Sequence, residues 1–156
     1  MTDRTNSSMA WTEEQLRRMS KVFMDAADPI LIEDLNGVVI DMNAEAELSY
    51  GWSRDELIGK PIKTIVPPDR HGQADELLER CKAGDDVRNI EGLRQTKDGG
   101  VIPVLLTLSL IRSESGEPDA VATLAKDISA QKRAEERLRK HRLQLEQEVS
   151  ERTAEM

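Results

Sequence analysis

The sequence predicts an α+β domain: a five-stranded antiparallel sheet with short helices on one face, an amphipathic helix before it and a long helix after it. Three observations lead to this fold class. The turn dipeptides Asn36-Gly37 and Asp98-Gly99 separate short runs rich in β-branched residues, which is typical of hairpins. Glycine and proline interrupt the stretch of helical composition between these hairpins, so several short helices are expected there. Beyond residue 129 the chain is a run of helix formers with interleaved charges.

The chain is expected to begin with a disordered tail over residues 1–10, followed by a flanking helix over residues 11–27. Thr12 opens this helix with a capping-box sequence, in which the Gln15 side chain reaches back to the cap. Apolar residues at helical spacing form one stripe along the helix: Leu16, Met19, Val22, Phe23 and Ala26. This stripe packs on its own domain, contacts a second copy of the chain, or does both.

The first hairpin is expected to join residues 29–34 to residues 38–42. Residues 43–57 then form two short helices, and Asn43 can cap the first of them with its side-chain oxygen. A longer helix over residues 73–83 follows and stops at a glycine. Its apolar side comprises Leu77, Leu78 and Cys81.

Three further strands are expected over residues 87–96, 101–111 and 120–128. In the second of these, one face carries Val104, Leu106, Leu108 and Leu110. The other face also carries apolar side chains, Leu105 and Ile111, whereas a sheet with one face in water shows a cleaner alternation. We therefore expect the second face to be covered too, by the N-terminal helix or by a partner subunit.

Residues 130–156 are expected to form a helix with a narrow apolar seam. The seam consists of Ala134, Leu138, Leu145 and Val149, with His141 in line. A seam this narrow suits a short parallel coiled coil better than burial against a core, although a coil this short dimerises only weakly by itself. Interleaved glutamates favour a solvated coiled-coil face over a nucleic-acid site for the basic cluster at residues 132–142.

Composition and charge exclude several functions. The formal net charge of −8 disfavours binding to nucleic acid or to an anionic membrane. The sequence has no signal-peptide pattern and no apolar run long enough to cross a bilayer. The single Cys81 forms neither an internal disulfide nor a metal site alone, so we expect a cytoplasmic location. Nucleophile triads, phosphate-binding loops and Cys/His clusters are missing from the sequence, so we expect the chain not to be an enzyme.

Several motifs, in the right order, resemble those of the PAS domain family over residues 16–138. These motifs are Asp34 to Val38, Met42-Asn43-Ala44, Tyr50 to Pro61, Lys97-Asp98-Gly99 before Pro103-Val104, and Lys126 to Ser129 running into Ala134 to Leu138. The resemblance implies a PAS domain over residues 28–129, the sensor segment of a signalling protein such as a histidine kinase of a two-component system. It also implies that Asp127, Ile128 and Ser129 couple the sheet to the output helix.

The resemblance places a possible ligand between the sheet and the long helix. The candidate cavity residues are Leu77, Leu78, Cys81, Leu106, Leu108, Leu124 and Trp52. Flavin photoreceptors of the LOV kind have a reactive cysteine where this chain has Ile62, so their chemistry is excluded. In haem-binding PAS sensors the proximal ligand position corresponds to Ala74, with His71 three residues earlier. We therefore expect no cofactor and no bound metal. In the alternative hypothesis of a haem sensor, His71 is the haem ligand.

Together these features predict a homodimeric PAS module that passes a ligand- or redox-induced change through its C-terminal helix to an output domain, a kinase or a cyclase, in a longer protein. The expected dimer contacts are Leu138, Leu145 and Val149 on the C-terminal helix, and Leu16, Met19 and Phe23 on the N-terminal helix. Contacts with nucleic acid or membrane are not expected. Two alternatives stay open: a ligand-free interaction or dimerisation module, and a haem or flavin redox or gas sensor.

Overall fold

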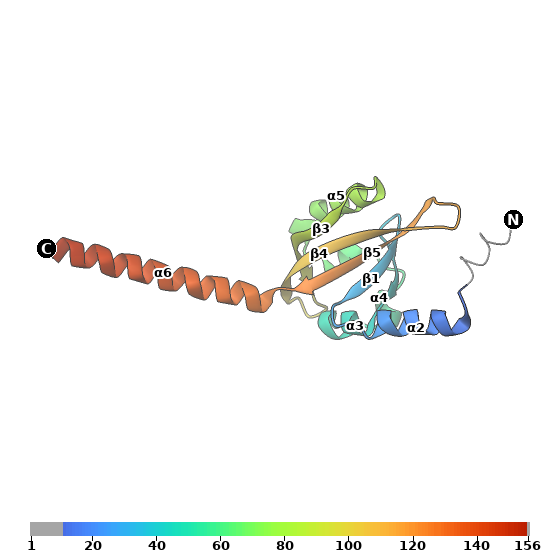
Figure 1. The fold of residues 1–156 in the computed structure, drawn as a ribbon, viewed down its shortest axis with the longest axis horizontal. Helices are drawn as coiled ribbons and strands as arrows, with labels where there is room; N and C mark the ends of the chain where they lie inside the picture. Colours follow the sequence, from blue (N-terminus) through green and yellow to red (C-terminus); the bar gives the residue numbers. More distant parts are fainter. Residues whose placement is uncertain (1–10, 156) are drawn as a thin grey trace.

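The computed structural model describes residues 11–155 (Figure 1), and the expected tail over residues 1–10 lies outside the described residues. The first half contains α2 (Glu13–Met24), β1 (Ile30–Asp34), β2 (Val39–Met42), α3 (Ala44–Tyr50), α4 (Arg54–Leu57), the 3₁₀ helices η1 (Ile62–Ile65) and η2 (Pro68–Arg70), and α5 (His71–Lys82). The second half contains β3 (Val87–Gln95), β4 (Val101–Arg112), β5 (Pro118–Asp127) and α6 (Ser129–Glu155). The predicted fold class is confirmed.

Local signals in the sequence account for the helix ends. The capping box of α2 is formed as predicted: the backbone N–H of Gln15 donates to the Thr12 hydroxyl at 3.1 Å, and the Thr12 N–H donates to Gln15 Oε1 at 2.8 Å. Helix α5 starts at His71, two residues earlier than predicted, because η2 leads directly into it. It ends before Gly84, whose φ of +91° suits a residue without a Cβ.

The sheet has the strand order β2-β1-β5-β4-β3, and every neighbouring pair is antiparallel. Helices α3, α4 and α5 lie on one side of it (Figure 1), and we call this side the inner face. Strand register puts Leu108 opposite Thr123 and Leu106 opposite Ala125, so these four side chains share the inner face. The aliphatic core lies between this face and the helices, as the scarcity of aromatic residues requires.

The core divides into two clusters of buried residues. One joins α5 to the inner faces of β3, β4 and β5, with Leu77, Leu106 and Val121 among its members. The other joins β1 and β2 to α3, α4 and η1, with Tyr50 and Leu57 among its members. Ile102 packs against both clusters, so the helices are fixed to the sheet as one body.

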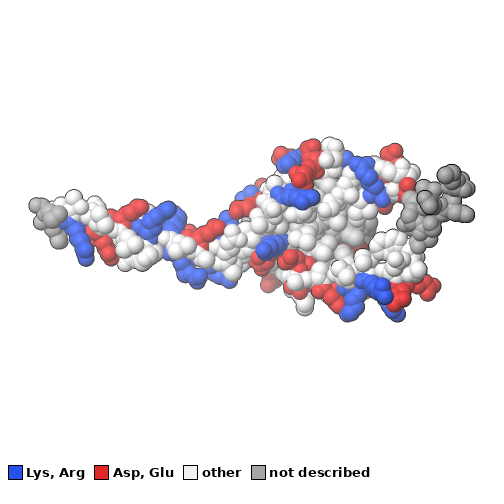
Figure 2. Space-filling model, in the orientation of Figure 1, with Lys and Arg blue, Asp and Glu red and all other residues white. Residues whose placement is uncertain are grey.

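The outer face of the sheet and helix α2 both leave apolar surface uncovered. Outer-face side chains such as Ile30, Ile32 and Leu105 are only half-buried, and Figure 2 shows an area without charged residues over the sheet. No residue of α2 is buried, and its stripe residues are widely exposed: Leu16 58%, Met19 49% and Val22 64%. Phe23 and Ala26, at the end of the stripe, are half-buried, so within the described chain α2 leaves most but not all of its stripe uncovered.

Helix α6 leaves the end of β5 and extends away from the domain (Figure 1). Its first turns contact the domain, but its seam residues are exposed: Leu138 70%, Leu145 47% and Val149 63%. Lysine and arginine alternate with glutamate along its visible side (Figure 2). An isolated helix of this composition has little tertiary support beyond its root.

Candidate functional site: interior cavity and root of the C-terminal helix

A small cavity lies between the inner face of the sheet and α5. Its volume is about 20 Å³, which is room for one water molecule. The apolar part of its wall consists of Ile62, Ala74, Leu77, Leu106 and Leu108. The rest of the wall is polar, made of Glu33, Arg94 and Thr123. The cavity is therefore an apolar pocket that contains a carboxylate, a guanidinium and a hydroxyl.

Glu33 is held inside the domain because β1 alternates: Leu31 and Glu33 both point to the inner face, and both are buried. The Thr123 hydroxyl on β5 donates to Glu33 Oε1 at 3.1 Å, and Oε2 has no hydrogen-bond partner among the described residues. Burial raises the pKa of Glu33 above its ordinary value of 4.5, whereas the Thr123 hydrogen bond and the Arg94 charge oppose this.

Arg94 lines the same cavity from β3, which is an edge strand of the sheet. Its Nε has no hydrogen-bond partner among the described residues, and no ion pair joins it to Glu33. The buried hydroxyl of Tyr50 on α3 is also without a partner, and burial raises its pKa while the Arg94 charge lowers it. Three buried polar side chains, Glu33 and Arg94 on the inner face and Tyr50 on α3, therefore each have an atom without a hydrogen-bond partner among the described residues.

Three of the seven predicted cavity residues line the cavity: Leu77, Leu106 and Leu108. Leu78 and Cys81 are buried beside it in the same core cluster. Burial raises the pKa of the Cys81 thiol, and the charge of Glu33 adds to this effect. Cys81 therefore remains a neutral thiol, which agrees with a packing role rather than a reactive one.

The prediction was wrong for Leu124 and Trp52. Leu124 pairs with Thr107 and with Ile30, so it points to the outer face, whereas its neighbour Thr123 points inward. Trp52 packs at the edge of the other core cluster, and its ring lies 4.7 Å from Lys60 Nζ and 5.2 Å from Lys97 Nζ. The ring thus contacts two cations and is not part of the cavity wall.

Haem and flavin do not fit this cavity. Pockets for ligands of drug size occupy roughly 300–1,000 Å³, far more than the space between α5 and the sheet. Ile62 and Ala74, where the resemblance would place a LOV cysteine and a haem ligand, are wall residues that fill the space. His71 lies outside the wall, and its Nε2 is 2.9 Å from the carbonyl oxygen of Val66.

The predicted coupling residues form the junction between β5 and α6. Asp127 Oδ1 accepts a hydrogen bond of 2.8 Å from the backbone N–H of Ser129, which satisfies a free donor at the start of the helix. Ile128 is buried, and its N–H donates to the carbonyl oxygen of Pro103 on β4 at 3.0 Å. The direction of α6 is therefore tied to two strands.

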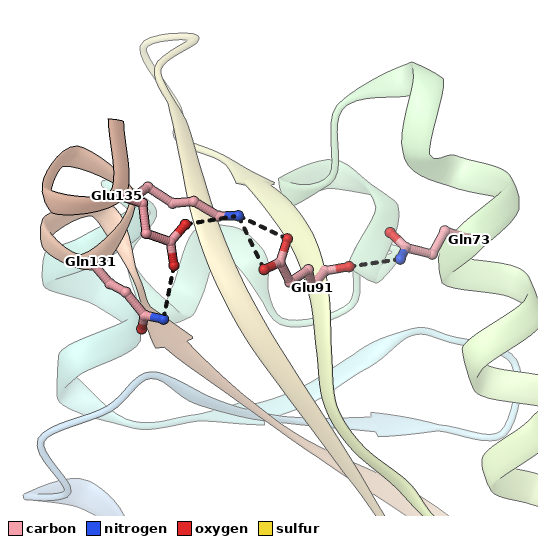
Figure 3. A network of polar contacts seen from close by, with 5 residues as sticks. Gln73, Glu91, Gln131 and Glu135 are labelled. Atoms are coloured by element: carbon pink, nitrogen blue, oxygen red, sulfur yellow. Dashed lines mark hydrogen bonds and ion pairs between the residues drawn. The ribbon is translucent and has the colours of Figure 1, made fainter. Parts of the chain in front are cut away.

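A polar network links this root to α5 and β3 (Figure 3). Lys132 Nζ on α6 lies 3.0 Å from both carboxylate oxygens of Glu91 on β3 and 3.9 Å from Glu135. Gln73 on α5 donates to the backbone carbonyl of Glu91 at 2.9 Å. The backbone carbonyl of Glu91 therefore contacts α5, which lines the cavity, and its side-chain carboxylate contacts α6.

The polar cavity residues were missed at the level of sequence. Glu33 lies two residues after the inward-facing Leu31, and that spacing in a strand is the signal that could have found it. Thr123 alternates with Val121 and Ala125 in the same way. Arg94 follows Gly92 at the same interval, but no local pattern indicates that its side chain lines the same cavity as Glu33.

Comparison with known proteins identifies the family. The sequence matches the PAS fold over residues 17–128, which is most of the chain. The chain therefore belongs to the PAS family. A solved PAS domain from Colwellia psychrerythraea has the same fold, with a TM-score of 0.68 at 24% identity over 74% of this chain and 98% of that one.

Relatives in this family include sensor histidine kinases. The chain is 25% identical to the sensor histidine kinase TmoS of Ectopseudomonas mendocina over 92% of its own length and 14% of the kinase. A solved domain of a sensory box sensor histidine kinase/response regulator from Geobacter sulfurreducens is similar at 26% identity, with a TM-score of 0.62 over 72% of this chain and 94% of that one. The chain thus spans a small part of its kinase relatives, and its general role is sensory and signal-transducing. Within residues 11–155, no helix combines the length and apolarity that a membrane span requires.

Proposed function

We propose that the chain is a homodimeric cytoplasmic sensory module, without catalytic activity, whose α6 transmits a change inside the domain to an output domain in a longer protein. The carrying observation is α6 itself: a helix fixed to two strands at its root and exposed along its apolar seam. Kinase relatives that extend well beyond the matched segment support an output domain such as a kinase. Ligand binding or a redox change would then shift the populations of two packings of the dimer.

The seam of α6 supports pairing with a second copy. Leu138 and Leu145 are separated by one heptad and therefore lie on the same side of the helix. Both side chains are exposed in the part of the chain that the structure describes, Leu138 at 70% and Leu145 at 47%. A second α6 in parallel would bury both residues and continue the dimer toward the C-terminus.

The outer face and α2 support the same assembly. The stripe of α2 and the uncharged area over the sheet are apolar surfaces that the described chain leaves open. A second copy covering them would complete the burial that the strand pattern of β4 predicts. The dimer would then hold the domains at one end and the α6 helices at the other.

Sedimentation of a double variant tests the proposal. Leu138→Asp with Leu145→Asp places two carboxylates in the seam, so we expect the dimer to dissociate at least tenfold more readily, a cost of about 1.4 kcal/mol or more. Leu143→Asp is the control, because it is five residues from Leu138 and about 140° around the helix. An unchanged dimer mass for the double variant would remove α6 from the interface.

A ligand-free interaction module is the second candidate, and the small cavity volume favours it. The visible absorption spectrum of the purified protein separates the possibilities. A spectrum without bands agrees with both the ligand-free module and a colourless ligand. A haem or flavin band would show that the interior opens far beyond 20 Å³ and would restore the redox hypothesis with His71 or Trp52.

A further inference from the structure

The interior contains a carboxyl group and a guanidinium that form no ion pair. Glu33 and Arg94 are each 3% exposed and both line the cavity, and no ion pair joins them. Glu33 Oε2 and Arg94 Nε are both without hydrogen-bond partners among the residues that the structure describes. Two buried ions in this arrangement lack the close geometry that offsets the loss of hydration.

Protonation of Glu33 removes the cost of keeping its carboxylate charge away from water. A guanidinium does not lose its proton in a protein, so the carboxylate is the member of the pair that changes charge. We infer that the Glu33 carboxyl group is a proton-binding site and that the hydrogen ion is a signal registered by this domain. The inference rests on the proposed sensory function, because it names the stimulus of the same site.

The proton step needs only water and the cavity. A hydronium ion gives its proton to Oε2 of Glu33, an O–H bond forms, one water molecule is released and the carboxylate charge disappears. The cavity of about 20 Å³, which Glu33 and Arg94 both line, has room for a single water molecule. A site of this size selects a proton or water over an organic ligand.

Groups from four elements act on Glu33. Arg94 on β3 favours the ionised form, as does the hydroxyl of Thr123 on β5. Asp34, the next residue on β1, disfavours it. Cys81 faces it from α5 as a neutral thiol, and β4 contributes only Leu106 and Leu108 to the cavity wall. Burial is the largest influence, and it raises the pKa of Glu33 above 4.5.

Strand β3 provides a route from this site to α6. Its inner face carries Arg94, and three residues earlier its outer face carries Glu91, which holds Lys132 (Figure 3). When Glu33 becomes neutral, the buried charge of Arg94 loses its counter-charge and the side chain takes a new position. A shift of β3 then acts on the Glu91–Lys132 contact at the root of α6.

A nuclear magnetic resonance titration tests the site directly. The Glu33 side-chain carboxyl carbon is followed with pH, together with the backbone amides of Ser129 to Lys132. We expect Glu33 to titrate above 4.5, and the root amides to show a transition with the same midpoint. Thr123→Val removes the hydrogen bond that favours the charged form, so it should move both midpoints upward. His71→Gln removes a histidine outside the cavity and should leave both unchanged.

Glu33→Gln provides a second measurement, since the amide imitates the protonated acid. Because the folded-state pKa lies above the unfolded one, ionised Glu33 destabilises the fold at high pH, and the penalty disappears as pH falls to 4.5 and below. The wild type should therefore lose stability relative to Glu33→Gln as pH rises through the folded-state pKa. If Glu33→Gln does not fold, the upward shift of both titration midpoints in Thr123→Val still tests the inference.

The outcomes separate this inference from the proposed function. A Glu33 midpoint at or below 4.5, or root amides that do not follow Glu33, would overturn the inference while leaving the dimer test of Leu138 and Leu145 untouched. Root amides that follow Glu33 in a chain that sediments as a monomer would support the proton site and contradict the dimer.

Discussion

At the scale of single residues, the close approach of Gly92 to Leu106 determines how β3 packs over the cavity. A Cβ added at Gly92 would lie 2.7 Å from Leu106 Cδ1, which is inside van der Waals contact. Leu106 is buried and lines the cavity, so it has little freedom to move away. We expect Gly92→Ala to lower the free energy of unfolding by about 1–3 kcal/mol, measured by urea denaturation.

Gly72→Ala is the control for this prediction. Gly72 lies in α5, and no atom lies within 4 Å of a Cβ built there. Alanine favours a helix more than glycine does, so this change should leave stability unchanged or raise it by up to about 1 kcal/mol. Equal losses for the two variants would show that loss of glycine itself, and not the contact with Leu106, is responsible.

Residue positions show where reasoning from the sequence succeeded and where it stopped. The inward face of β4 was predicted correctly because apolar residues alternate without a break. The predicted face of Leu124 was wrong, because β5 is apolar on both faces around Thr123 and the polar Thr123 itself points inward. That Glu33 and Arg94 line the same cavity depends on the strand order, which brings together residues distant in sequence and is not encoded in any local motif.

At the scale of elements, Asn43 joins the first strand to the first helix inside the domain. Its Oδ1 accepts hydrogen bonds from the backbone N–H groups of Ile30 at 3.0 Å and Ala46 at 3.1 Å, and its Nδ2 donates to the carbonyl of Asp28 at 3.0 Å. The side chain is fully buried. Asn43→Ala would leave these groups unpaired, so we expect a loss of about 2–4 kcal/mol in urea denaturation.

The helix cap at Ser53 is the comparison for Asn43. Its hydroxyl accepts from the backbone N–H of Glu56 at 3.2 Å, and both residues are exposed to water. Ser53→Ala removes a cap alone, so we expect a loss of about 1 kcal/mol. A loss for Asn43→Ala no larger than this would mean that its contacts with β1 add nothing to its cap.

Element boundaries followed local signals closely. The capping role of Asn43 was predicted from its position after a strand and is confirmed. The two short helices and both hairpins were also predicted from turn residues and caps. The early start of α5 was missed because two prolines suggested an irregular segment, whereas Pro68 begins a 3₁₀ turn that continues as α-helix.

At the scale of the whole molecule, the sequence did not decide what covers the apolar stripe of α2. The stripe could pack on its own domain or contact a second copy of the chain. The periodicity of a stripe indicates that a helix has an apolar side, but not what covers it. The structure narrows the choice, because no residue of α2 is buried within the described chain. Contact with a second copy therefore remains the interpretation to be tested.

Substitutions on α2 test this interpretation at the level of assembly. Met19→Asp with Val22→Asp changes the charge of the exposed stripe by two units and should raise the dimer dissociation constant more than tenfold in sedimentation experiments, because a dimer that uses the stripe would bury both side chains. The urea midpoint of the domain should change little, since neither residue belongs to its core. Arg17→Asp is the matched control: it changes the charge equally but lies about 160° from the centre of the stripe. Equal increases of the dimer dissociation constant in the two variants would attribute the effect to charge. An unchanged dissociation constant in both would exclude α2 from the dimer.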